Sequence, residues 1–245
     1  MIYEIYHETN FDYAGLVTFS HNIARLKPKN CTTQKLLEYS LSMEPNPYET
    51  NEFIDYFENT NNFMLIREAH KSLKVIATSK VERLEYEIKK ESYLLNTAKI
   101  TLAQLKERLS TYHPNDVMAK YFLFETESIP MPSSEIKEYI LASFNENRNV
   151  IEATNEFMAR IFNDFKFVSG FSDITTPIEV IFKEKKGVCQ DFAQFAISAL
   201  RSIGIPARYV SGYIQTLPPE GKEKLFGADA SHAWFSIYIP DFGWA

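Results

Sequence analysis

Residues 187–204 read GVCQDFAQFAISALRSIG, and this stretch predicts a helix with a broad buried face. Its apolar residues recur three and four positions apart, the spacing of one helical face; they are Phe192, Phe195, Ala196, Ala199, Leu200 and Ile203. Gly204, with Pro206 close behind, ends the helix. The helix starts near Cys189, so this thiol lies where the chain enters a helix.

The position of Cys189 suits nucleophilic chemistry. Unpaired backbone N–H groups and the positive end of the helix dipole favour a thiolate over a thiol. The same N–H groups can stabilise the negative charge that develops when sulfur attacks a carbonyl. Gly187 allows a substrate to approach closely. An inert buried cysteine is the alternative interpretation of a lone thiol in such a segment.

Two β-rich runs follow the helix, at 207–214 and 233–239, and this order of helices and then strands indicates an α+β core. In the second run, Ala233, Phe235, Ile237 and Ile239 share the core face. His232 then projects from the other face, toward whatever covers it, which can be the Cys189 helix. A histidine paired with a helix-start cysteine is a natural general base. A structural or surface histidine is the alternative.

A third group should orient the imidazole of His232 through its other ring nitrogen, and the residues leave its identity open. Asp241 lies in a predicted turn, where aspartates usually bond their own backbone. Asp191 lies in the first turn of the helix, on a different face from Cys189. Asp229 precedes His232 by three residues in a predicted loop. We assign none of the three aspartates to this role.

The first part of the chain, to about residue 95, predicts β structure. Residues 73–81 alternate as a strand with one buried face does. Similar runs occupy about 2–9, 14–28 and 32–44. Several strands in series suggest a small sandwich or barrel-like sheet.

Three leucines then mark a change of pattern, because helical spacing separates Leu102, Leu105 and Leu109. From Ser134 onward the signals are helical, and Thr176 to Glu179 fit a capping box with Pro177 at the first helical position. We therefore expect three parts: a β domain at 1–95, a connecting segment at 96–130 and a catalytic core at 131–245.

Composition excludes several classes of protein. With 45% hydrophobic and 14% aromatic residues the chain is globular, and its net charge of −6 argues against nucleic-acid binding. No apolar run approaches the ~20 residues of a membrane helix, and the N-terminus does not resemble a signal peptide. We expect a cytoplasmic protein. Two cysteines form no disulfide framework and the five histidines are scattered, so we expect neither metal nor cofactor.

At this point a family is recognisable. Residues 187–214 (GVCQDFAQFAISALRSIGIPARYVSGYI) and 230–244 (ASHAWFSIYIPDFGW) closely resemble the bacterial transglutaminase-like superfamily, which includes transglutaminase-like enzymes and proteins described as cysteine proteases. The N-terminal part resembles the small β domain of this family. The resemblance implies a papain-like core with Cys189 as nucleophile and His232 as base. The residues expected to bind substrate are Gly187, Gln190 and Trp234.

The sequence departs from the family pattern in two places. Gln194 stands where family members commonly carry histidine, which affects substrate preference more than mechanism. The family's orienting aspartate follows the Gly-Trp pair, and by that spacing it falls about three residues after Ala245. We therefore expect the triad acid outside these 245 residues.

The predicted activity is thiol-dependent acyl transfer on the amide bonds of a protein or peptide, through a Cys189 thioester. Transfer to water makes a protease or amidase, and transfer to a lysine amine makes a protein-glutamine transglutaminase; the sequence leaves both open. The alternative is a transglutaminase-like binding or scaffold module with weak or no activity. A metal-dependent hydrolase is a third hypothesis. We expect neither nucleic acid nor membrane as a partner.

Overall fold

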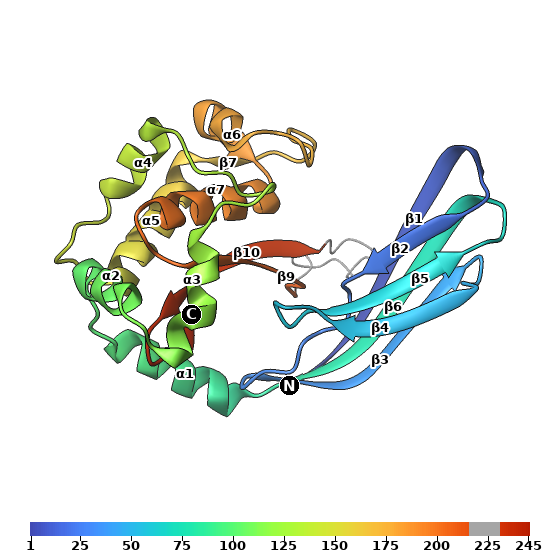
Figure 1. The fold of residues 1–245 in the computed structure, drawn as a ribbon, viewed down its shortest axis with the longest axis horizontal. Coiled ribbons are helices and arrows are strands. Elements are labelled where there is room, and N and C mark those ends of the chain that lie inside the picture. Colours follow the sequence, from blue (N-terminus) through green and yellow to red (C-terminus); the bar gives the residue numbers. More distant parts are fainter. Residues whose placement is uncertain (216–230) are drawn as a thin grey trace, which may run out of the picture. The chain divides into compact units, whose positions relative to one another are not determined.

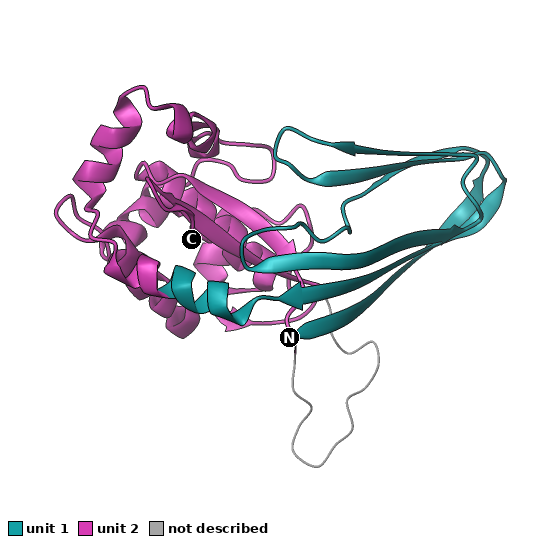
Figure 2. Ribbon diagram, turned by 90° about the horizontal axis from the view of Figure 1, so that it is seen from below, with its two compact units in different colours: residues 1–92 teal, residues 93–245 magenta. Residues whose placement is uncertain are grey.

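The computed structural model describes residues 1–215 and 231–245, and it divides the chain into two compact units, Met1–Ser92 and Tyr93–Ala245 (Figure 2). The first unit consists mainly of strands, and the second contains helices around a short sheet (Figure 1). Each unit has its own hydrophobic core. Within the described ranges, every helix is too short or too polar to cross a membrane.

The first unit is a small β sandwich, which confirms the predicted N-terminal architecture. Its strands are β1 (Ile2–Val17), β2 (Ser20–Ala24), β3 (Gln34–Glu44), β4 (Glu49–Ile54), β5 (Thr60–Ile66) and β6 (His70–Arg83). They form two antiparallel sheets, in the orders β1-β6-β3 and β2-β5-β4. Both sheets contribute to one core, since Met43, Leu73 and Val75 cluster with Met64 and Ile66.

Two boundaries in the first unit differ from the prediction. The run over 14–28 is not one strand, because β1 continues to Val17 and β2 starts only at Ser20. The β structure also ends earlier than residue 95, because helix α1 (Glu85–Thr97) begins after β6. The residues of α1 are mostly glutamate, lysine, leucine and other residues that favour helices, so local propensity accounts for the helix.

The second unit has the predicted α+β arrangement. Its α-helices are α2 (Leu102–Ser110), α3 (Val117–Lys120), α4 (Ser134–Leu141), α5 (Val150–Asp164), α6 (Ile178–Glu184) and α7 (Cys189–Ser202). Two short 3₁₀ turns flank α3, namely η1 (Pro114–Asp116) and η2 (Tyr121–Leu123). The strands are β7 (Lys166–Phe167), β8 (Lys186–Gly187), β9 (Ala207–Gly212), β10 (His232–Ile239) and β11 (Gly243–Trp244). Strands β9, β10 and β11 form an antiparallel sheet with β10 in the middle.

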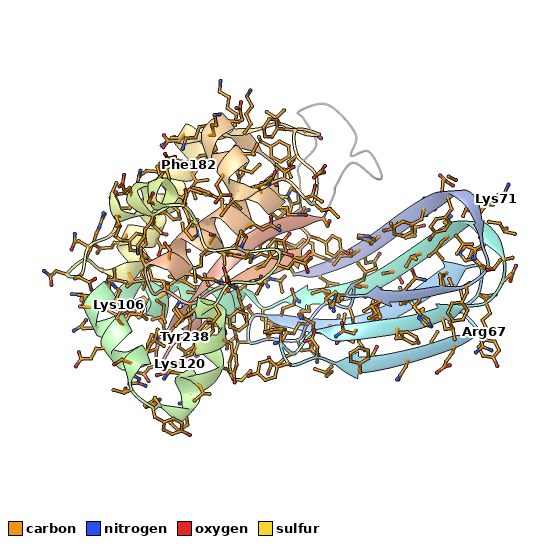
Figure 3. The ribbon with its side chains drawn as sticks, turned by 45° about the horizontal axis from the view of Figure 1, so that its top comes forward. Arg67, Lys71, Lys106, Lys120, Phe182 and Tyr238 are labelled. Atoms are coloured by element: carbon orange, nitrogen blue, oxygen red, sulfur yellow. The ribbon has the colours of Figure 1, made fainter. Side chains whose placement is uncertain are left out.

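Helix α7 lies in the centre of the second unit and is buried on nearly all sides. The ring of Phe195 is stacked on Phe182 of α6 at 5.8 Å between centroids, and lies 5.0 Å from Phe165 and 6.3 Å from Phe157 of α5. Phe182 is labelled in Figure 3. On its other side α7 packs against β10, whose Ile237 belongs to the same core. The position of α7 is therefore fixed by apolar packing from several elements.

The C-terminal end of α7 is tied to the sheet. Arg201 is 7% exposed, and its guanidinium donates to the carbonyl of Ala207 at 3.0 and 2.9 Å and to that of Phe124 at 2.7 Å. Burial lowers the pKa of Arg201 to about 10. Gly204 adopts a φ of +89°, in the region that favours glycine, and turns the chain after the helix. Strand β9 consequently starts beside the end of α7.

A second tie joins the sheet to the segment before the helices. Asp116 of η1 is fully buried, and its carboxylate accepts from the Arg108 Nε at 2.7 Å and from the Tyr238 hydroxyl at 2.8 Å. Burial opposes ionisation of Asp116, but the bonds from Arg108 and Tyr238 outweigh it and lower its pKa. Tyr238, labelled in Figure 3, belongs to β10. This cluster holds the η1 turn against one face of the sheet.

The first prediction concerns the core around α7. Replacing Phe195 by alanine removes a fully buried ring and leaves a cavity, so we expect a loss of about 3–5 kcal/mol in the free energy of unfolding. Phe162→Ala on α5 is the matched control, because this ring is 85% exposed. Denaturant unfolding of both variants checks the difference. Equal losses would contradict the central role of Phe195.

The second prediction concerns Asp116. Asp116→Asn removes a charged acceptor from two buried hydrogen bonds, so we expect a loss of about 2–3 kcal/mol at pH 7. Asp241→Asn is the control, because Asp241 also accepts from Arg108, at 3.0 Å, but its side chain is 74% exposed. We expect that control to stay within about 0.5 kcal/mol.

The contribution of Asp116 also depends on pH. Its folded pKa is lowered, so its stabilisation is present above the unfolded carboxyl pKa of about 3.9 and is lost as the pH falls through the folded value. The stability difference between the natural protein and Asp116→Asn should therefore shrink from about pH 5 toward pH 2. Thermal melts across this range measure it, and a constant difference would contradict the assignment.

Candidate active site

The topology brings the predicted nucleophile and base to one end of the second unit. Helix α7 runs from Cys189, and the short turn at 203–206 returns the chain as β9 alongside it (Figure 1). Strand β10 is antiparallel to β9, and His232 pairs with Gly212, the last residue of β9. The first residue of α7 and the first residue of β10 therefore lie at the same end of the helix and sheet.

Cys189 is the first residue of α7 and its thiol is free and half-buried. The first bond within the helix runs from the Phe192 N–H to the Val188 carbonyl at 3.2 Å. The earlier N–H groups, from Cys189 to Asp191, therefore point out of the helix end. A thiolate or an oxyanion at this end would meet these N–H dipoles. The predicted location of the thiol at a helix start is confirmed.

The residues around this helix start are held by Asp191. Its side chain is 3% exposed, and one carboxylate oxygen accepts from the Val188 N–H at 2.7 Å and from the Ser172 hydroxyl. Ser172 belongs to the loop between β7 and α6. A buried carboxylate in the first turn also interacts favourably with the helix dipole.

Helix α7 covers the face of the sheet opposite to the one that the sequence suggested. Helix α7 packs against the face that carries Ile237 and Ile239, which are core residues as predicted. The opposite face carries Trp234 and Tyr238, and Tyr238 contacts η1 instead. The suggestion that the Cys189 helix covers the histidine face is therefore wrong for this part of β10, because the apolar face of α7 needs the apolar face of the strand.

His232 is half-buried and lies at the first position of β10. Strand alternation assigns its Cβ to the face of Trp234. Within residues 1–215 and 231–245, no hydrogen bond joins Cys189 to His232. Catalytic hydrogen bonds are often long or poorly aligned in a free enzyme and tighten only when substrate binds. Because α7 covers the other face of the sheet, the imidazole of His232 can approach the thiol of Cys189 only past the end of the sheet.

The indole of Trp234 lies over Gly212. A Cβ at Gly212 would come within 2.7 Å of the outermost ring carbon of Trp234. The side chain of Trp234 is 40% exposed, and Gly212 is the partner of His232 in the ladder. The missing side chain at Gly212 thus makes room for an exposed aromatic surface next to His232. The substrate contact of Trp234 stays a prediction.

Gly187 and Gln190 flank the thiol in different environments. Gly187 is buried, and a Cβ there would lie 2.8 Å from a carboxylate oxygen of Asp191 and 3.1 Å from the ring of Phe192. Packing alone therefore requires glycine at this position. Gln190 is half-buried in the first turn of α7. The substrate contacts predicted for Gly187 and Gln190 stay predictions.

Tyr209 of β9 also belongs to the site, and the sequence did not single it out. Burial raises the pKa of Tyr209, and the negative charges of Cys189 and Asp191 raise it further. The ring is 37% exposed. Tyr209 pairs with Phe235 and so lies on the face that α7 covers. Strand alternation gave the face of Tyr209, but only the packing of α7 brings it near the thiol.

Two of the three aspartates that could orient the imidazole bond other groups in the structure. Asp241 follows the far end of β10, which lies about 23 Å from His232 at ~3.3 Å per strand residue, and it bonds Arg108. Asp191 bonds the chain in front of Cys189. Asp229 lies outside the described residues. Strand β11 is antiparallel to β10, so its direction leads toward the His232 end of the sheet.

Among the described residues, no three His, Cys, Asp or Glu side chains come together in a way that could hold a metal ion. Cys31 and Cys189 are both free thiols.

The predicted capping box at 176–179 is wrong, because α6 starts at Ile178 and the Thr176 hydroxyl bonds Asp173 instead.

Comparison with known proteins identifies both units. Residues 3–82 match the family described as bacterial transglutaminase-like N-terminal region, and residues 139–245 match the transglutaminase-like superfamily. An uncharacterized protein of Mycobacterium tuberculosis is 30% identical over 238 residues, which cover 97% of this chain and 74% of the relative. A protein-glutamine gamma-glutamyltransferase of Pseudomonas aeruginosa is 36% identical over 67 residues, which cover 27% of this chain and 10% of that protein.

A solved structure shows the same fold over the whole chain. The crystal structure of a candidate cysteine protease from Cytophaga hutchinsonii has a TM-score of 0.69 and 20% identity, and the match covers 100% of this chain and 77% of that one. The β sandwich, the α+β core and the two family matches agree with the resemblance seen in the sequence. The chain belongs to the transglutaminase-like superfamily and carries the bacterial N-terminal region of that family.

Proposed function

We propose that this protein transfers acyl groups from amide substrates by way of a thioester on Cys189. The observation that carries the proposal is the half-buried free thiol at the first position of α7, at the same end of the unit as His232. Helix-end N–H groups favour both the thiolate and the oxyanion that its attack creates.

The reaction has two steps. The Cys189 sulfur attacks the amide carbonyl, and N–H groups of the α7 start stabilise the tetrahedral oxyanion. His232, protonated by the thiol, gives this proton to the leaving amine as the C–N bond breaks, which leaves a thioester. Water or a second amine then attacks the thioester, His232 takes its proton, and the thiol is regenerated.

The name of the Pseudomonas aeruginosa relative supports transfer to an amine, and that of the Cytophaga hutchinsonii protein supports transfer to water. The first likeness covers 27% of this chain and the second has 20% identity, so neither selects the acceptor. Incubation with a glutamine-containing peptide, with and without a primary amine, distinguishes the outcomes. Ammonia release with amine incorporation indicates a transglutaminase, and backbone cleavage indicates a protease.

The third prediction tests the nucleophile and base. Cys189→Ala should abolish turnover, and His232→Ala should lower kcat by about 10²–10⁴-fold, because each removes a group that takes part in bond making or proton transfer. Turnover of a peptide amide, with amine or water as acceptor, measures both effects.

The matched control is Cys31→Ala. Cys31 is the other cysteine of the chain, and it is an exposed free thiol in the first unit, so its loss should leave turnover unchanged. Iodoacetamide at mildly acidic pH should label Cys189 faster than Cys31. Equal labelling rates, together with no turnover on any amide, would favour the binding or scaffold module.

The fourth prediction tests the surface beside His232. Gly212→Ala places a methyl group against the Trp234 ring, so we expect the indole to move and KM to rise by about tenfold if the ring holds substrate. Tryptophan emission in a Trp244→Phe background reports the movement, because the chain has only two tryptophans.

Gly15→Ala serves as the control for the same change. A Cβ at Gly15 meets no atom within 4 Å, so emission and KM should both stay as they were. A Gly212→Ala protein whose emission shifts while KM stays constant would show that Trp234 packs next to the site without contacting substrate.

A further inference from the structure

The chain in front of Cys189 is held by one carboxylate that the proposed reaction does not use. Asp191 is 3% exposed, and a single oxygen of its carboxylate accepts from both the Val188 N–H, at 2.7 Å, and the Ser172 hydroxyl. Val188 is the residue immediately before the nucleophile. A buried carboxylate needs hydrogen-bond donors to offset the loss of water. Here one donor comes from the chain just before the helix and the other from the loop between β7 and α6.

The surroundings of Asp191 are built around this contact. Gly187 has no side chain, and a Cβ there would meet the Asp191 carboxylate at 2.8 Å and its Cβ at 2.9 Å. The loop that carries Ser172 is fixed at its base, because the Val168 N–H donates to the Gly187 carbonyl at 2.9 Å. Asp191 thus connects three segments at the helix start: the loop, the residue that follows strand β8, and α7.

We propose that Asp191 is a positioning residue for the nucleophile. By holding the Val188 N–H it fixes the peptide that leads into Cys189, and with it the direction of the first N–H groups of α7. By holding Ser172 it fixes the neighbouring loop as a wall of the same site. This inference rests on the proposed acyl transfer at Cys189, and it assigns to Asp191 a task other than orienting the imidazole.

A positioning role is distinguishable from a purely structural one by its effect on the thiol. Among the described residues, the titratable groups on the elements at this end of α7 are Asp191 on the same helix, Tyr209 on β9 and His232 at the start of β10. Asp191→Asn keeps the size of the side chain but replaces the charged acceptor by a neutral amide oxygen, which weakens the hydrogen bonds from the Val188 N–H and the Ser172 hydroxyl. The loss of a negative charge beside a thiolate favours the thiolate, whereas the loss of orientation slows acyl transfer.

The experiment uses the full chain with Cys31→Ala, so that Cys189 is the one thiol present. In Asp191→Asn we expect the pH midpoint of iodoacetamide alkylation to move down. We also expect kcat to fall by about 10–100-fold while KM stays within about twofold. Ser172→Ala keeps the charge and removes one donor, so its kcat should fall less and its alkylation midpoint should stay unchanged.

Glu184→Gln is the matched control, because it removes one carboxylate charge from the exposed end of α6 and should change neither quantity. The amount of folded protein is normalised by circular dichroism. A folded Asp191→Asn protein with natural kcat and an unmoved alkylation midpoint would overturn the inference, and so would a variant that only melts earlier. Turnover that persists in Cys189→Ala would instead sink the proposed function, while the alkylation profile would still report on Asp191.

Discussion

The burial of α7 is the constraint on which the rest of the second unit depends. Phe195 and Leu200 are fully buried, and rings from α5 and α6 pack around the helix on one side. Strand β10 packs on the other side through Ile237 and Ile239. Because neighbours on both sides hold the helix, its first residue has a defined position. The half-buried thiol of Cys189 therefore lies at the end of a helix that packing holds in place.

Buried polar contacts hold the two ends of α7. Arg201 ties the end of α7 to the start of β9, and Asp191 ties its beginning to Val188 and Ser172. Each is a buried ionisable group that bonds to the chain at one end of the same helix, and neither forms an ion pair among the described residues. Hydrogen bonds of this kind are directional, so they set the position of backbone segments that apolar contacts alone leave adjustable.

Much of the fold could be predicted from local pattern. The alternation in β6, the leucines of α2 and the apolar spacing of α7 all gave the correct elements, because each reports which face of one element is buried. The errors occurred at boundaries. Helix α1 began inside the part predicted as β, although the propensity of its own residues accounts for it. Thr176 bonded Asp173 in the loop instead of capping α6, because competing local hydrogen bonds cannot be ranked from sequence.

By itself, the sequence determined that a thiol stands at a helix start and a histidine at the start of a strand. It also determined the family, since the motifs around Cys189 and His232 are contiguous in the chain. Only the tertiary structure decided which face of the sheet α7 covers, that Trp234 rests on Gly212, that Asp191 holds the chain in front of the thiol, and that Tyr209 lies within electrostatic reach of it. The reason is physical. Periodicity gives the buried face of each element, but which faces meet depends on packing between segments distant in sequence.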